Sequence, residues 1–103
     1  MNSHAVEFEV LNDGNTYSEW MCVYKARTGT PLVGICIKRG VANWNVHGRN
    51  IRRIPQFEGW KKGTKFVFTV VQDNASNGSA TLHVALLAAD GTVNTEVVRI
   101  CAL

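Results

Sequence analysis

The chain has 103 residues, of which 46% are hydrophobic and 18% are charged. This length suits one globular domain, and the composition excludes an intrinsically disordered protein. No apolar run reaches the roughly 18 to 20 residues needed to cross a membrane. We therefore expect a single β domain over residues 1–103 without a membrane partner. The amino terminus lacks a secretory signal, which favours a cytoplasmic location, with secretion after leader removal left open.

Alternating apolar and polar residues predict β-strands from the beginning of the chain. Val6, Phe8 and Val10 are separated by glutamates, which is the period-two pattern of a half-buried strand. The polar residues 12–15 tolerate positive φ and predict a hairpin turn. A second strand is expected over residues 17–25.

The middle of the chain continues this pattern with less regularity. A reversal over residues 27–31 precedes a strand over 32–39, which is rich in β-branched residues. Residues 44–47 and 49–54 then predict either two short strands or one bent strand broken at Gly48. Pro55 and the residues after it predict a loop.

The last third of the chain gives the clearest strand signals. Alternation over residues 66–71 and 80–88 predicts a hairpin, and Asp90-Gly91 predicts a two-residue turn into a strand over 95–101. No stretch carries a capped helical stripe. About seven strands at this spacing predict an all-β fold, a single antiparallel β-sandwich or barrel, and the local pattern leaves both forms open.

Positive charge is concentrated in residues 38–65. Eight of the 11 Lys and Arg residues lie there beside a single acid, Glu58, so this basic segment carries a charge of +7 and the rest of the chain −4. Aromatic residues are interleaved with the cations. Such a cluster is typical of a surface that binds an anionic or planar ligand.

No catalytic, metal or cofactor motif accompanies this segment. The sequence contains no G-x-S-x-G, H-E-x-x-H, P-loop or dinucleotide fingerprint. The three cysteines, Cys22, Cys36 and Cys101, form no C-x-x-C pair and predict reduced thiols. We therefore expect a binding protein that is not an enzyme and holds neither metal nor cofactor.

The leading hypothesis is binding of an anionic polymer, with single-stranded nucleic acid favoured. Arginine and lysine would neutralise phosphates while Trp44 or Trp60 stacks on a base. The predicted ligand-binding residues are Trp44, His47, Arg49, Arg52, Arg53, Trp60, Lys61 and Lys62.

Two other functions and one purely structural interpretation remain open. In the first, a lectin-like carbohydrate site has a tryptophan floor and polar walls from Asn43, Asn45, Asn50 and His47. In the second, the chain is a self-assembling subunit, such as a coat or decoration protein, and forms homo-oligomers by pairing basic and acidic surfaces. In the structural interpretation, the tryptophans are core residues and the cations protect a strand edge from aggregation.

Overall fold

The computed structural model describes residues 2–72 and 79–102. This part of the chain forms eight β-strands and one short 3₁₀ helix, and it contains no helix long and apolar enough to cross a membrane. The elements are β1 (Asn2–Glu9), β2 (Trp20–Lys25), β3 (Pro31–Lys38), β4 (Val41–Val46), β5 (Arg49–Arg53), η1 (Pro55–Phe57), β6 (Lys65–Gln72), β7 (Ser79–Leu87) and β8 (Val93–Ala102).

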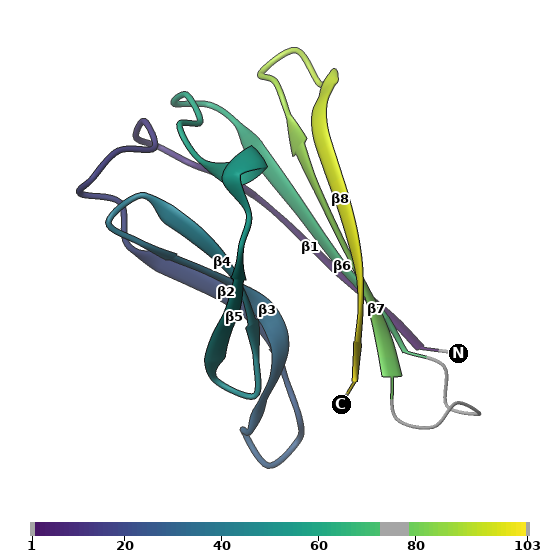
Figure 1. Cartoon of the computed structure of the whole chain (residues 1–103). Coiled ribbons are helices and arrows are strands. Elements are labelled where there is room, and N and C mark those ends of the chain that lie inside the picture. Colours follow the sequence, from purple (N-terminus) through teal and green to yellow (C-terminus); the bar gives the residue numbers. More distant parts are fainter. Residues whose placement is uncertain (1, 73–78, 103) are drawn as a thin grey trace. The chain divides into compact units, whose positions relative to one another are not determined.

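The strands form two separate antiparallel sheets of four strands each (Figure 1). One sheet has the order β1-β6-β7-β8, and the other is a meander in the order β2-β3-β4-β5. The predicted all-β antiparallel class is confirmed. Each sheet ends in two edge strands, so the described strands form no closed barrel. The count is eight because the segment around Gly48 forms two paired strands.

The two sheets belong to different compact units. Unit 1 combines Met1–Asn12 with Lys62–Leu103, and unit 2 is the continuous segment Asp13–Lys61. The structure divides the chain into two compact units. The single domain expected over residues 1–103 therefore stays a prediction.

In unit 2, the central strand β3 supplies much of the buried apolar surface. Val33, Ile35 and Ile37 alternate along one face and are at most 1% exposed. They lie opposite Val46, Trp44 and Ala42 of β4, so the same row of apolar contacts continues across two strands. This alternation with β-branched residues is what a strand buried in the interior of a sheet requires.

Two tight turns at opposite ends of β4 shape this sheet. Arg39 and Gly40 connect β3 to β4, and His47 and Gly48 connect β4 to β5. All four residues have positive φ, between 52° and 80°. Positive φ at both central residues of a two-residue loop is the geometry that matches the twist of a hairpin. Arginine and histidine occupy positions where asparagine or glycine would be less strained.

In unit 1, the sheet follows the predicted alternation. Phe66, Phe68 and Val70 of β6 are all buried. Phe66 pairs with Phe8 of β1, and the two rings stack with centroids 5.4 Å apart. The predicted hairpin of β6 and β7 is confirmed by their antiparallel register. The turn predicted between them falls mainly on residues 73–78, which lie outside the described residues.

Two predicted turns differ from the structure. Residues 12–15 do not form a hairpin, because β1 pairs with β6 and β2 pairs with β3. β1 forms its backbone hydrogen bonds with β6, which is distant in sequence, and not with the next strand along the chain. The connection between β7 and β8 is also longer than two residues. It spans Ala88 to Thr92, and its ends are joined by a hydrogen bond of 2.8 Å from the Ala88 N–H to the Thr92 carbonyl.

Candidate nucleic-acid interface

Trp44 is a packing residue of the sheet in unit 2. It lies on β4, is 3% exposed, and meets Phe57 of η1 edge to face, with ring centroids 6.2 Å apart and an interplanar angle of 72°. Aromatic rings favour this arrangement because the positive edge of one ring meets the negative face of the other. Burial leaves the indole without an open face for a base or a sugar.

Trp60 is also buried, at 6% exposure. Its indole lies 5.7 Å from that of Trp20, centroid to centroid, and its carbonyl accepts a 2.7 Å hydrogen bond from the Gly14 N–H. A Cβ atom on Gly14 would lie 2.6 Å from the Trp60 ring, so only glycine allows this approach. Both indoles are therefore buried, and the ligand contacts predicted for Trp44 and Trp60 stay a prediction.

Arg53 forms an ion pair with Glu58 within unit 2. Its Nε and Nη2 donate hydrogen bonds of 2.7 Å to the two carboxylate oxygens of Glu58. Glu58 also accepts a longer hydrogen bond, 3.4 Å, from the Ala42 N–H. The bidentate pair lowers the pKa of Glu58, chiefly through the hydrogen bond from Arg53, although partial burial opposes the shift. Arg53 is thus less available to a phosphate than its neighbours on β5.

This pair makes a prediction about acidity. Arg53→Gln should raise the pKa of Glu58 towards the ordinary glutamate value, measurable by carboxyl-carbon NMR titration. The folded-state pKa is depressed, so the pair stabilises the fold above the ordinary pKa of glutamate. That stability is lost as the pH falls through the folded-state value. The pKa of Asp90, which Thr92 lowers, should not move and serves as the control. An unchanged titration of Glu58 would contradict this account.

The remaining arginines of β5 are open to solvent. β5 is an edge strand, and all five of its residues are exposed. Arg49 lies opposite Val46 and Arg52 lies opposite Trp44. Among the described residues, neither arginine has an ion pair.

The structure adds two cations that sequence reasoning missed. Lys25 ends β2, and Arg27 lies in the turn that follows it. This turn lies at the same end of the sheet as the His47-Gly48 turn, because β3 and β4 are antiparallel neighbours and the His47 N–H donates a 2.9 Å hydrogen bond to the Leu32 carbonyl at the start of β3. The resulting group, which we term the basic end of unit 2, consists of Lys25, Arg27, His47 and Arg49.

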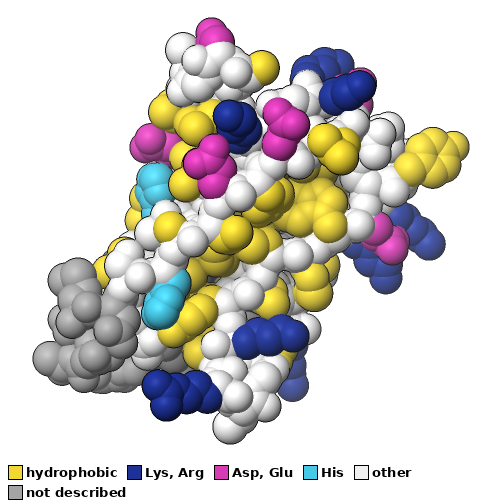
Figure 2. Space-filling view, turned by 180° about the vertical axis from the view of Figure 1, so that it is seen from behind, with side chains coloured by type: hydrophobic (Ala, Val, Ile, Leu, Met, Phe, Trp, Pro, Cys, Tyr) yellow, Lys and Arg dark blue, Asp and Glu magenta, His cyan; other side chains and the backbone are white. Residues whose placement is uncertain are grey.

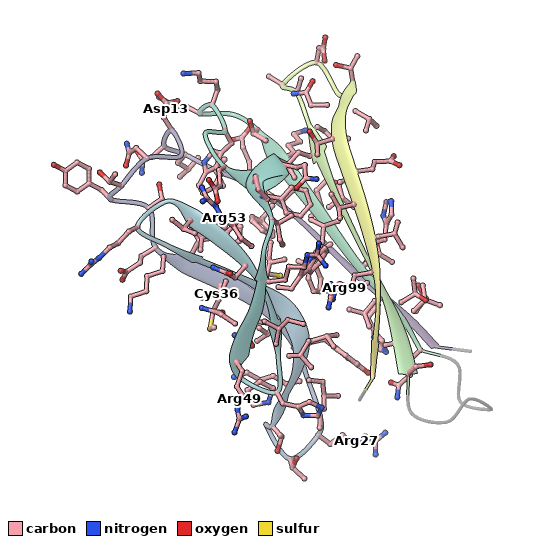
Figure 3. All side chains as sticks on the ribbon, in the orientation of Figure 1. Asp13, Arg27, Cys36, Arg49, Arg53 and Arg99 are labelled. Atoms are coloured by element: carbon pink, nitrogen blue, oxygen red, sulfur yellow. The ribbon has the colours of Figure 1, made fainter. Side chains whose placement is uncertain are left out.

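The basic end is exposed and free of acidic neighbours from unit 2. All four side chains are exposed, and within the described part of the chain none has an ion pair. Arg27 and Arg49 lie at the same end of the sheet in Figure 3, with Asp13 at the other. In Figure 2 this end is at the bottom, where Lys and Arg side chains are visible and Asp and Glu side chains are not.

The charge of the whole chain is unevenly divided between the units. Unit 2 contains eight Lys and Arg residues and three acids, Asp13, Glu19 and Glu58, for a net charge of +5. Unit 1 contains three Lys and Arg residues and five acids, for a net charge of −2. The positive field therefore belongs to the segment that forms the meander.

The predicted pair Lys61 and Lys62 is divided by the boundary between the units. Lys61 is exposed and ends unit 2, whereas Lys62 is exposed and belongs to unit 1. Neither belongs to the basic end. The structure thus brings together His47 and Arg49, leaves Arg52 beside them along β5, and engages Arg53 with Glu58.

No protein-family model, no curated protein and no solved structure matches this chain.

The polar residues of the carbohydrate hypothesis form only a small contact. Asn45 is 3% exposed, and its Nδ2 donates a 3.0 Å hydrogen bond to the Asn50 Oδ1. Asn43 is half-buried on the same strand. Since both tryptophans are buried as well, these residues do not line an open pocket with an aromatic floor.

A shallow depression of about 320 Å³ lies elsewhere in unit 2. Its lining residues are Glu19, Trp20, Met21, Cys36, Ile37 and Lys38. One acid and one base give it no charge preference. Cys36 and Cys22 are free and half-buried, and burial raises the pKa of the Cys22 thiol. The side chain of Cys101 lies outside the described part. No group of three His, Cys, Asp or Glu residues among those described could hold a metal ion.

Proposed function

We propose that this protein binds an anionic polymer, with single-stranded nucleic acid as the leading candidate, through the basic end of unit 2 and the adjoining strand β5. The observation that carries the proposal is that two hairpin turns lie at one end of the sheet in unit 2, and that the four basic side chains in and beside them are exposed and form no ion pair with a described residue. Such a surface attracts a phosphate backbone without neutralisation by its own neighbours.

Four permanent cations are available for phosphates. Lys25, Arg27 and Arg49 lie at the basic end, and Arg52 follows along the exposed edge strand. Arginine suits this contact because its planar fork matches two phosphate oxygens. Arg53 is a weaker contributor, since Glu58 already occupies both of its donor positions.

Binding should depend steeply on salt. For four phosphate contacts on a single strand, the affinity should fall by about 50-fold between 50 and 200 mM salt, because each contact releases about 0.7 of a counterion. Fluorescence anisotropy with a fluorescein-labelled 12-mer of deoxythymidine measures this directly. The double variant Arg27→Gln, Arg49→Gln should reduce the slope by about 1.4 and weaken binding at low salt.

A charge-matched variant separates a local site from a general effect of net charge. Lys65→Gln removes one positive charge from unit 1 and should weaken binding less than Arg49→Gln alone. Equal losses for the two single variants would place the attraction in the overall charge. No binding by the wild-type protein at 50 mM salt would refute the proposal.

A further inference from the structure

Among the Phe, Trp and Tyr residues that the structure describes, Tyr17 alone is exposed. All nine Phe, Trp and Tyr residues lie in the described part of the chain, and the other eight are buried or half-buried. Tyr17 is 92% exposed. An aromatic ring left in water forgoes the burial that rings normally gain, and exposed tyrosines are enriched where proteins bind ligands and partners.

The backbone that carries Tyr17 is held in place by its neighbours. The Tyr17 N–H donates a 2.9 Å hydrogen bond to the Asn15 Oδ1. The Ser18 N–H donates to the Asn15 carbonyl at 3.0 Å, and the Asn15 N–H donates to the Ser18 Oγ at 3.1 Å. A ring on a fixed backbone loses less conformational entropy on binding than a ring on a loose loop.

Two basic segments are tied to this loop inside unit 2. The Gly40 N–H donates a 3.0 Å hydrogen bond to the Ser18 carbonyl, which places the turn containing Arg39 beside Tyr17. At the start of the loop, the Gly14 N–H donates a 2.7 Å hydrogen bond to the carbonyl of Trp60, the residue before Lys61. Arg39 and Lys61 are both exposed.

This end of the sheet is less positive than the basic end. Asp13 and Glu19 flank the Tyr17 loop in the sequence and partly offset the two cations. Charge alone would therefore not select this location for an anionic polymer. The exposed ring is the feature that distinguishes it.

We infer that Tyr17 is a stacking platform for an unpaired base, with Arg39 and Lys61, from the two segments hydrogen-bonded to its loop, available for the adjacent phosphates. The inference rests on the proposed function. It assigns base stacking to Tyr17, because Trp44 and Trp60 are buried. The six residues of β2 separate the Tyr17 loop from the basic end by about 20 Å at roughly 3.3 Å per residue. At about 3.4 Å per stacked nucleotide, a 12-mer can reach both.

The test compares two probes of equal length and charge. One is the labelled 12-mer of deoxythymidine, and the other is a labelled abasic 12-mer that keeps the phosphates but lacks the bases. Tyr17→Ala should lower the affinity for the first by about 5- to 150-fold, the range that stacking of one base supplies. It should leave the affinity for the abasic probe and the salt slope unchanged. Tyr17→Phe, which keeps the ring, should bind as the wild type does.

The controls separate this inference from the proposed function. Leu11→Ala truncates another exposed apolar side chain, 68% exposed in unit 1, and should change neither affinity. If Tyr17→Ala binds both probes as the wild type does while Arg27→Gln, Arg49→Gln is weakened, the stacking platform is refuted and the proposed function survives. If the wild type binds neither probe, both are refuted. Equal losses on both probes would also overturn a base-specific role.

Discussion

Replacing Gly34 by alanine is expected to destabilise unit 2 strongly, although it adds only one methyl group. Gly34 is buried on the central strand β3, opposite Val23 of β2. A Cβ atom at this position would overlap the Cys22 carbonyl oxygen and lie 2.6 Å from the Val23 Cα. Both are backbone atoms of the neighbouring strand, so relief requires β2 and β3 to separate. Overpacking of this kind typically lowers the free energy of unfolding by about 1 to 3 kcal/mol. Because the overlap here is with backbone atoms, which cannot rotate away, we expect a loss of about 3 kcal/mol or more.

Urea unfolding followed by tryptophan fluorescence measures this loss. A change of about 3 kcal/mol or more is a large share of the roughly 5 to 15 kcal/mol that stabilises a typical domain. Gly29→Ala is the control, because its Cβ atom would meet nothing within 4 Å although its φ is +89°. It should cost only about 1 to 2 kcal/mol, from the left-handed backbone alone. A Gly34→Ala variant within about 1 kcal/mol of the wild type would contradict the predicted overlap.

Phe57→Ala is expected to have the second large effect. Phe57 is fully buried in the short helix η1 and packs against Trp44. Removing a buried phenyl ring costs about 3 to 5 kcal/mol, because apolar contacts are lost and a cavity remains. Far-UV circular dichroism during thermal unfolding should show a lower midpoint.

The neighbouring residue provides a matched control for this substitution. Gln56 lies in the same helix and is exposed, so Gln56→Ala should change the free energy of unfolding by no more than about 0.5 kcal/mol. If Phe57→Ala and Gln56→Ala had equal midpoints, the ring of Phe57 would not be part of the core.

The fold class followed from the sequence because strand alternation is a local property. Phe66, Phe68 and Val70 alternate as predicted, and each is buried. Pairing of β1 with β6 was not predictable in this way. Nothing in the residues near Asn12 distinguishes a hairpin turn from a connection that leads to another sheet, because the partner strand lies more than 50 residues away.

The candidate site was only partly accessible from sequence for a related reason. Lys25 and Arg27 lie outside the basic segment 38–65, and only the antiparallel register brings them to His47 and Arg49. The burial of large apolar side chains such as the tryptophans agrees with their general tendency in a small protein. The sequence near Tyr17 did not predict its exposure. A strand was expected to begin at Tyr17, whereas β2 begins three residues later and leaves Tyr17 in the preceding loop.

The insertion of unit 2 into the sequence of unit 1 affects how the chain can assemble. The ladder between β1 and β6 closes a loop of 55 residues between Glu9 and Lys65. The strands of unit 2 pair only with their neighbours in sequence, so its meander can form without long-range contacts. Once unit 2 has folded and Gly14 is hydrogen-bonded to Trp60, only a few residues on each side separate this bond from the Glu9–Lys65 pair. By the logarithmic dependence on loop length, this shortening lowers the entropic cost of closing the β1–β6 ladder by about 2 kcal/mol.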